Sequence, residues 1–90
     1  MGSYLAQVDV MLKPLVNDPQ GLAVLDGLSN LGFEGVQTVR VGKRIEVTIA
    51  AADSAVAESM VREMCERLLA NPVIENFSLE ITETLPAESN

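Results

Sequence analysis

The strict alternation of apolar and polar residues near the end of the chain is the feature that most constrains its fold. Phe77, Leu79 and Ile81 alternate with three polar residues up to Thr82. A period of two predicts a β-strand with one buried face, because successive side chains of a strand point to opposite faces. The chain must therefore build a sheet and cover one side of it.

The same reasoning predicts three further strands. Residues 4–12 alternate and are expected to form the first strand. Residues 35–41 and residues 44–49 are two more extended segments. Gly42 and Lys43 lie between them as a turn of hairpin length. The sequence therefore predicts that these two segments pair in antiparallel fashion across that turn.

A first helix is predicted between the first two strands. Asp18 can accept hydrogen bonds from the free amides of a first turn, and Pro19 suits the first helical position. Apolar residues then recur at helical spacing; they are Val24, Leu25, Leu28 and Leu31. Gly32 is a suitable left-handed stop, after which Phe33 can fold back on the last turn.

A second helix is predicted to begin after Asp53 or Ser54 and to end before Pro72. Two adjacent apolar rows form the longest stripe in the chain. One row is Val56, Met60, Met64 and Leu68, and the other is Val61, Cys65 and Leu69. The opposite side is charged, so we expect this helix to cover a sheet with its apolar side.

The element order is therefore strand, helix, strand, strand, helix, strand. Two one-sided helices favour placement on the same face of one antiparallel sheet. This is the α+β, two-layer βαββαβ sandwich called ferredoxin-like. We expect residues 1–84 to form a single domain and residues 85–90 to form a flexible acidic tail.

Size and charge limit the possible partners. A chain of 90 residues buries only about 60% of its unfolded surface, and such domains often oligomerise. A net charge of −7 argues against nucleic acids and anionic membrane surfaces. The sequence has no apolar run long enough to span a bilayer and no signal peptide, so the expected compartment is a reducing cytoplasm.

Reactive chemistry is scarce in this composition. The chain has no histidine and one cysteine, Cys65, which we expect to be a buried small hydrophobe. It lacks a glycine-rich phosphate loop and a nucleophile elbow. We therefore expect no catalytic residue, cofactor site or metal site. Asp9 could pair with Arg40 or Lys13, which is a structural role.

Five motifs at the junctions between predicted elements together resemble one protein family. They are Leu12-Lys13-Pro14, Asp18-Pro19-Gln20-Gly21, Leu31-Gly32-Phe33, Val39-Arg40-Val41-Gly42-Lys43 and the run from Met64 to Glu75. The family is PurS, the small subunit of the multi-subunit phosphoribosylformylglycinamidine synthase (FGAM synthase) of purine biosynthesis. The resemblance spans residues 5 to about 82 and departs from the family at Leu15 and in the extended acidic tail.

The resemblance implies a bridging role without catalytic residues. In this family the small subunit joins a PurL-like synthetase subunit, which binds ATP and formylglycinamide ribonucleotide, to a PurQ-like glutaminase subunit, which releases ammonia from glutamine. The complex forms formylglycinamidine ribonucleotide, and the small subunit aids assembly and the passage of ammonia. ATP and Mg would lie on the synthetase subunit. A homodimer or a dimer of dimers fits the small core.

Polar residues at the junctions are the candidates for partner contact. They are Lys13, Gln20, Arg40, Lys43, Asn71 and Glu75. Roles in turns and helix caps do not explain why Lys13 and Gln20 occupy these positions. Arg40 and Lys43 either protect a sheet edge or contact an acidic partner surface or a phosphate.

Two other classes of function share this fold. One is an amino-acid-sensing regulatory module, which is often dimeric. The other is a nucleic-acid binder on the open sheet, which needs exposed aromatics and a basic face. Aromatic residues make up 3% of the chain, so the second class is disfavoured.

Overall fold

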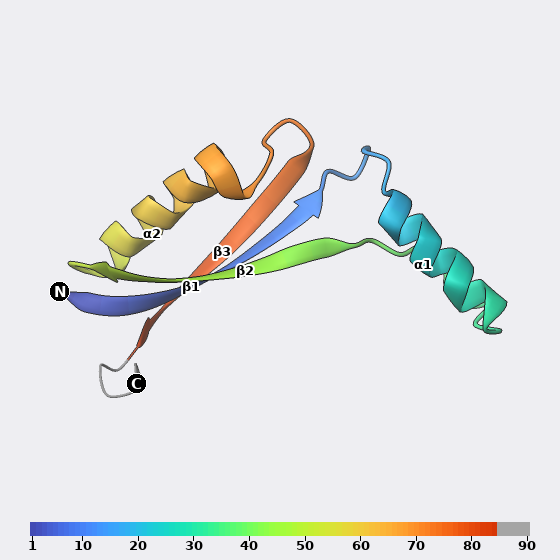
Figure 1. Cartoon of the computed structure of the whole chain (residues 1–90), viewed down its shortest axis with the longest axis horizontal. Coiled ribbons are helices and arrows are strands. Elements are labelled where there is room, and N and C mark those ends of the chain that lie inside the picture. The colour runs from blue at the N-terminus through green and yellow to red at the C-terminus, as the bar shows by residue number, and fades with distance from the viewer. Residues whose placement is uncertain (85–90) are drawn as a thin grey trace.

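The structure is a computed structural model that describes residues 1–84 as a sheet with two helices (Figure 1). The strands are β1 (Gly2–Leu12), β2 (Gly42–Ala51) and β3 (Glu75–Thr84), and the helices are α1 (Pro19–Asn30) and α2 (Ser54–Met64). A π-helical turn, η1 (Cys65–Leu69), continues α2. The acidic tail predicted for residues 85–90 lies outside the described residues.

β1 is the central strand of an antiparallel sheet with the order β2-β1-β3. Every second residue of β1 from Tyr4 to Val10 is buried, because neighbouring strands flank it and α2 packs on that face. Val8 lies opposite Ile45 on β2 and Leu79 on β3. All three strands lie where the alternation predicted them, and the predicted α+β class is confirmed.

The strand predicted for residues 35–41 is wrong. These residues form no strand, and Gly42 and Lys43 begin β2 instead of making a hairpin turn. β2 pairs with β1. The physical reason is that β2 pairs directly with β1, and where the segment enters β2 a side chain replaces a neighbouring strand: the Asp18 carboxylate accepts the N–H of Val41. Within the described part of the chain the sheet has three strands.

α1 begins and ends as the sequence predicts. Asp18 caps it and Pro19 occupies the first turn. Gly32 has a φ of 96°, in the left-handed region that glycine enters at little cost. The N–H of Phe33 then donates to the carbonyl of Leu28 at 3.0 Å. This bond satisfies a carbonyl that the helix end would otherwise leave free.

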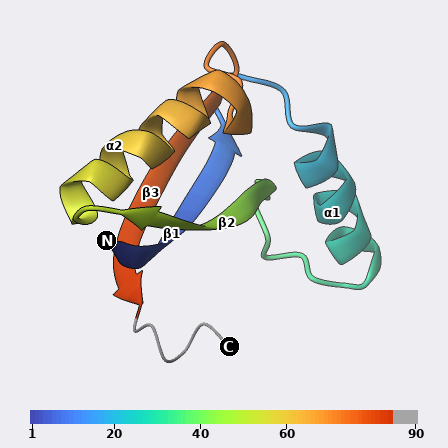
Figure 2. The same cartoon turned by 60° about the vertical axis from the view of Figure 1, so that its left-hand side comes forward.

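The position of α1 differs from our expectation. Figures 1 and 2 show α2 lying along the sheet, whereas α1 projects beyond the end where β1 finishes and β2 starts. The Cα radius of gyration is 17.1 Å, against about 12 Å for a compact domain of this length. The expectation that both helices cover one face is therefore met by α2 only, within the described residues.

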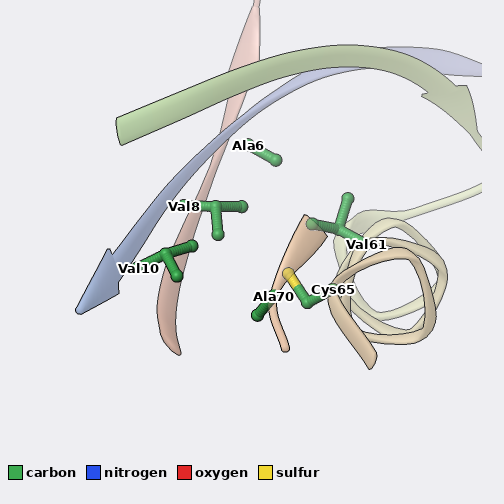
Figure 3. Close-up of a cluster of buried hydrophobic side chains, with 6 residues drawn as sticks. All are labelled: Ala6, Val8, Val10, Val61, Cys65 and Ala70. Carbon is green, nitrogen blue, oxygen red and sulfur yellow. The ribbon is translucent and has the colours of Figure 1, made fainter. Parts of the chain in front are cut away.

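The core lies between β1 and the helical segment of α2 and η1. Figure 3 shows its buried side chains: Ala6, Val8, Val10, Val61, Cys65 and Ala70. The prediction that Cys65 is buried is confirmed. Burial raises the pKa of its thiol, so the thiolate that reacts with electrophiles is disfavoured.

The apolar stripe predicted on the second helix is only partly buried. Ala57, Val61 and Cys65 face the sheet. The other row remains partly outside the core: Leu68 is 82% exposed and Met60 is 41% exposed. One sheet can cover only the side of α2 that faces it, so Met64 still packs against the core while Val56, Met60 and Leu68 stay exposed.

Candidate partner interface at one end of the sheet

The junctions that carry the six candidate contact residues lie at one end of the sheet. The strand register places Leu12 opposite Glu75 on one side, and Val10 opposite Lys43 on the other. A hollow of about 380 Å³ opens there, and it is lined by Gln20, Lys43 and Glu75 together with apolar residues of β1 and β2. Three of the six candidate contact residues therefore share one surface.

Asp18 is the structural centre of this end. It is 8% exposed, and it accepts hydrogen bonds from the N–H of Gly21 at 2.9 Å and of Val41 at 3.0 Å. The Nε of Arg40 lies 3.4 Å from Asp18 Oδ2, the oxygen that also accepts the N–H of Val41. The N–H donors of Val41 and Gly21, with the Arg40 guanidinium, hold the pKa of Asp18 below its ordinary value. A buried carboxylate with these partners is structural.

The Arg40 side chain also makes hydrogen bonds within the fold. Its Nη2 donates to the carbonyl of Leu12 at 2.8 Å and to that of Lys13 at 3.2 Å. Together with the Asp18 contact, these bonds tie the segment before β2 to the segment after β1. We call this set of contacts the Asp18–Arg40 node. The Arg40 side chain is still 34% exposed, so its contact with a partner stays a prediction.

Gly21 has a packing role that the sequence did not reveal. A Cβ at this position would collide with the backbone carbonyl oxygen of Val39. The segment after α1 therefore runs against the first turn of α1 only because residue 21 has no side chain. The sequence predicts a helix start at Asp18 and Pro19, and a close chain crossing at Gly21 leaves no further mark in it.

Asn71 and Glu75 hold the turn that leads into β3. The Oδ1 of Asn71 accepts the N–H of Val73 at 3.0 Å, and the N–H of Asn71 donates to Glu75 Oε1 at 2.6 Å. The backbone N–H of Lys13 donates to the carbonyl of Ile74 at 2.8 Å. These contacts fix the turn beside the end of β1. The side chains of Asn71 and Glu75 therefore stabilise the fold, whether or not they also bind a partner.

The remaining candidates have unused polar groups. The side chains of Lys13, Gln20 and Lys43 make no hydrogen bond or ion pair with any other residue in the range 1–84. Lys43 and Gln20 line the same hollow. Of the six candidates, these side chains are the best placed to bind another molecule.

The pairing expected for Asp9 is wrong. Asp9 binds Arg44 through two hydrogen bonds of 2.9 and 3.2 Å, and neither Arg40 nor Lys13 reaches it. The cause is register, because β2 pairs directly with β1 and places Arg44 opposite Asp9. The hydrogen bond from Arg44 lowers the pKa of Asp9. The pair lies exposed on the open face of the sheet.

The described residues offer little reactive chemistry. Residues 1–84 contain no group of three or more histidine, cysteine, aspartate or glutamate side chains arranged to hold a metal ion. None of the helices in this range is long and apolar enough to span a membrane. The arrangement at this end of the sheet suits recognition of another surface: a hollow with an unpaired cation, an amide and a fixed acidic turn.

Comparison with known sequences identifies the same family along nearly the whole chain. The family model of PurS, described as phosphoribosylformylglycinamidine (FGAM) synthase, matches residues 5–83. The phosphoribosylformylglycinamidine synthase subunit PurS of Synechocystis is 51% identical over 80 residues, which are 89% of this chain and 80% of that protein. The Bacillus subtilis subunit of the same name is 45% identical over 82 residues, 91% of this chain and 96% of that protein.

Comparison with solved structures supports the same family assignment. The C2 crystal form of B. subtilis PurS superposes with a TM-score of 0.80 at 46% identity, covering 89% of this chain and 99% of that one. A chain in the structure of PurLQS from Thermotoga maritima has a TM-score of 0.80 at 31% identity, covering 93% and 100%. With the family model spanning residues 5–83 and the three-stranded fold in common, the chain belongs to the PurS family.

Proposed function

We propose that this chain is the non-catalytic small subunit of FGAM synthase in de novo purine biosynthesis. It joins the synthetase subunit to the glutaminase subunit, and the assembled complex converts formylglycinamide ribonucleotide to formylglycinamidine ribonucleotide with ATP and glutamine. The observation that carries the proposal is the family match over residues 5–83, together with the likeness to a chain of the PurLQS structure.

Bridging is a task that suits the residues present. Ammonia released by one subunit must reach the other before bulk water dilutes or protonates it. An interface does this by excluding water, which needs shape and satisfied hydrogen bonds rather than reactive side chains. The hollow at the end of the sheet has an apolar lining, and Gln20, Lys43 and Glu75 add hydrogen-bonding groups to it. ATP and Mg would be held by the synthetase subunit, with no cofactor on this chain.

The proposed assembly has specific parts. The chain forms a homodimer or a dimer of dimers in the cytoplasm, and binds PurL-like and PurQ-like subunits. Lys43 and Gln20 contact a partner directly, and so does Lys13. Asn71, Glu75 and Arg40 shape the same surface and contribute contacts where they are exposed.

The amino-acid-sensing alternative is not favoured, since the relatives described above are named as PurS subunits. Calorimetry of the isolated chain with glutamine and glycine separates the two functions. The bridging subunit is expected to release no heat of binding with either amino acid.

Co-purification and activity test the bridging role. The chain is mixed with candidate synthetase and glutaminase subunits, and the glutamine-dependent formation of ADP is measured with and without it. We expect a ternary complex by light scattering and activity that depends on the chain. Equal activity in its absence would end the proposal.

A further inference from the structure

One face of the sheet is covered by neither helix of the described chain. α2 packs on the face that carries Ala6, Val8 and Val10, and the residues of β1 between them point to the other side. Figures 1 and 2 show that α2 lies on one side of the sheet and that α1 projects beyond its end. We call the uncovered surface the open face. Its charged centre consists of Gln7, Asp9, Arg44, Glu46 and Glu80.

The strand register places a glutamate on either side of Gln7. Gln7 lies opposite Glu46 on β2 and opposite Glu80 on β3, so the backbones of the two acidic residues are about 10 Å apart, which is two strand spacings. The Nε2 of Gln7 donates to Glu46 Oε2 at 3.1 Å. The Glu80 side chain makes no hydrogen bond or ion pair with another residue in the range 1–84. Two carboxylates therefore flank one amide.

The nearby cation does not neutralise these glutamates. Arg44 is held by Asp9 through hydrogen bonds of 2.9 and 3.2 Å, so this base and this acid cancel each other. Glu46 and Glu80 then leave the charged centre with a net charge of −2. The centre of the open face therefore attracts positive charge.

The row of residues beside Gln7 is uncharged. Leu5 lies between Thr48 and Thr82 in the register, and its side chain is only partly exposed. The open face thus joins an acidic row to an apolar residue flanked by hydroxyl groups. Both kinds of group are needed in an interface, where apolar contacts lie beside polar ones.

We propose that the open face binds a basic surface of one enzyme subunit, with a lysine or arginine side chain above Gln7 between Glu46 and Glu80, and an apolar side chain against Leu5. An ammonium or guanidinium group in this place donates to both carboxylates, and hydrogen bonds between charged groups are stronger than neutral ones. This inference rests on the proposed function and names the chemistry of one of its two partners.

Charge selects a different protein over a second copy of the chain. Two copies that stacked through their open faces would bring a net charge of −2 against another of −2, and like charges oppose association. The whole chain has a net charge of −7, so a second copy offers no basic surface of its own. A partner subunit with clustered lysine or arginine side chains has the complementary charge.

The open face and the hollow at the end of the sheet can be occupied at the same time. Lys43 lies opposite Val10 in the register, so its side chain is on the helix-covered side of the sheet. Glu46 and Glu80 lie on the other side. A subunit that joins two others needs two separate surfaces, and these two surfaces differ in the sign of their charge.

Titrations with each enzyme subunit alone test the open face. Glu80→Lys places a cation where the partner's cation must lie, and the fold tolerates the change because the Glu80 side chain has no partner within residues 1–84. With the labelled chain, we expect the affinity for either the synthetase or the glutaminase subunit to fall about ten-fold or more, and the affinity for the other to stay within about two-fold. The matched control, Glu66→Lys, makes the same change of charge on η1, in the helical layer, and should leave both affinities within about two-fold.

A neutral variant separates charge from shape. Glu80→Gln keeps the size of the side chain, so its affinity should fall between those of the wild type and Glu80→Lys. Its affinity should also depend less on salt concentration, because one pair of opposite charges fewer is screened. Equal salt dependence of the wild type and Glu80→Gln would contradict a contact between Glu80 and a cation.

The outcomes distinguish the failure of this inference from that of the proposed function. If the wild-type chain binds neither subunit, the proposed function fails and the inference fails with it. If the wild type binds both subunits and Glu80→Lys behaves like Glu66→Lys, only the inference fails. Light scattering of the chain alone is the third measurement. Glu80→Lys should leave the molar mass unchanged, and a lower mass would show that the open face holds a second copy, which overturns the proposal.

Discussion

α1 and α2 carry the same local signals, yet only one of them lies on its own sheet. Each begins with an aspartate that accepts a first-turn N–H, and each has an apolar side. α2 lies between β2 and β3 in the chain, and both of these strands pair with β1, so the helix must return over the sheet. α1 lies between β1 and β2, which are antiparallel neighbours, so the chain leaves and re-enters the sheet at the same end and α1 need not cross it. A helix is therefore placed by the strands on either side of it, and not by its own pattern.

The largest expected effect lies in the packed half. Val61 on α2 is buried against β1, so Val61→Ala removes two methyl groups and leaves a cavity. We expect it to lower the free energy of unfolding by about 2 kcal/mol. Val56 on the same helix is 41% exposed, and Val56→Ala should change that free energy by at most about 0.5 kcal/mol. Urea unfolding followed by circular dichroism, at one protein concentration, measures both, and equal losses would show that α2 is not seated as described.

The two helix caps sharpen the comparison. Asp53 caps α2 through one hydrogen bond, to the N–H of Val56 at 2.9 Å, and Asp53→Ala should cost about 1 kcal/mol. Asp18 serves Gly21, Val41 and Arg40 together. Asp18→Ala should therefore cost more stability than Asp53→Ala, although α1 has less packing.

Limited proteolysis separates a cap effect from the loss of the Asp18–Arg40 node. We expect Asp18→Ala to speed cleavage within residues 35–41, because Val41 loses the acceptor that fixes this segment. Asp53→Ala should leave cleavage there unchanged. If both variants are cut at the same rate in residues 35–41, the node does not hold the segment.

The pH dependence of stability follows from the two lowered carboxyl pKa values. The hydrogen bonds from the N–H groups of Val41 and Gly21 lower the pKa of Asp18, and Arg44 lowers that of Asp9. A lowered pKa contributes stability that is present above the unfolded value of about 3.9, and it is lost as the pH falls through the folded value. We expect Asp18→Asn to be less stable than the wild type by a constant amount from about pH 5 to 8, with the gap closing below about pH 4. A gap that widens in acid would contradict the assignment.

The sequence predicts most of the fold because its signals are local. The period of two located all three strands, and the caps at Asp18 and Asp53 with the stop at Gly32 located both helices. Residues 35–41 were misread because Val39 and Val41 alternate with Thr38 and Arg40 as a strand would. Nothing nearby in the chain shows that the carboxylate of Asp18 takes the N–H of Val41.

The candidate site was predicted in part for the same reason. Junction residues are visible as breaks in a pattern, and the register brought Lys43, Glu75 and Gln20 to one hollow. The partners of Arg40 are backbone carbonyls of a segment far from it in the sequence, so they cannot be predicted from local patterns. The same holds for the ion pair of Asp9 and Arg44. The pattern of α1 shows that it has an apolar side but not that the helix projects beyond its own sheet (Figure 1).

The smallest effect on stability, and the most specific effect on assembly, is expected at Lys43. Its side chain has no partner within residues 1–84 and lines the hollow at the end of the sheet. Lys43→Glu should change the free energy of unfolding of the isolated chain by at most about 0.5 kcal/mol. It should nevertheless weaken binding to the synthetase or glutaminase subunit, because a carboxylate would then face the acidic partner surface that Lys43 is proposed to contact.

A graded series distinguishes charge from shape at this position. Lys43→Met keeps the length of the side chain and removes the charge, so its affinity for the partner subunits should fall between those of the wild type and Lys43→Glu. Arg40→Glu is the less informative variant, since it also places a second carboxylate against Asp18 and disturbs the fold. If titrations with labelled partner subunits give one affinity for the wild type, Lys43→Met and Lys43→Glu, then Lys43 only protects the edge of β2 and the contact surface lies elsewhere on the molecule.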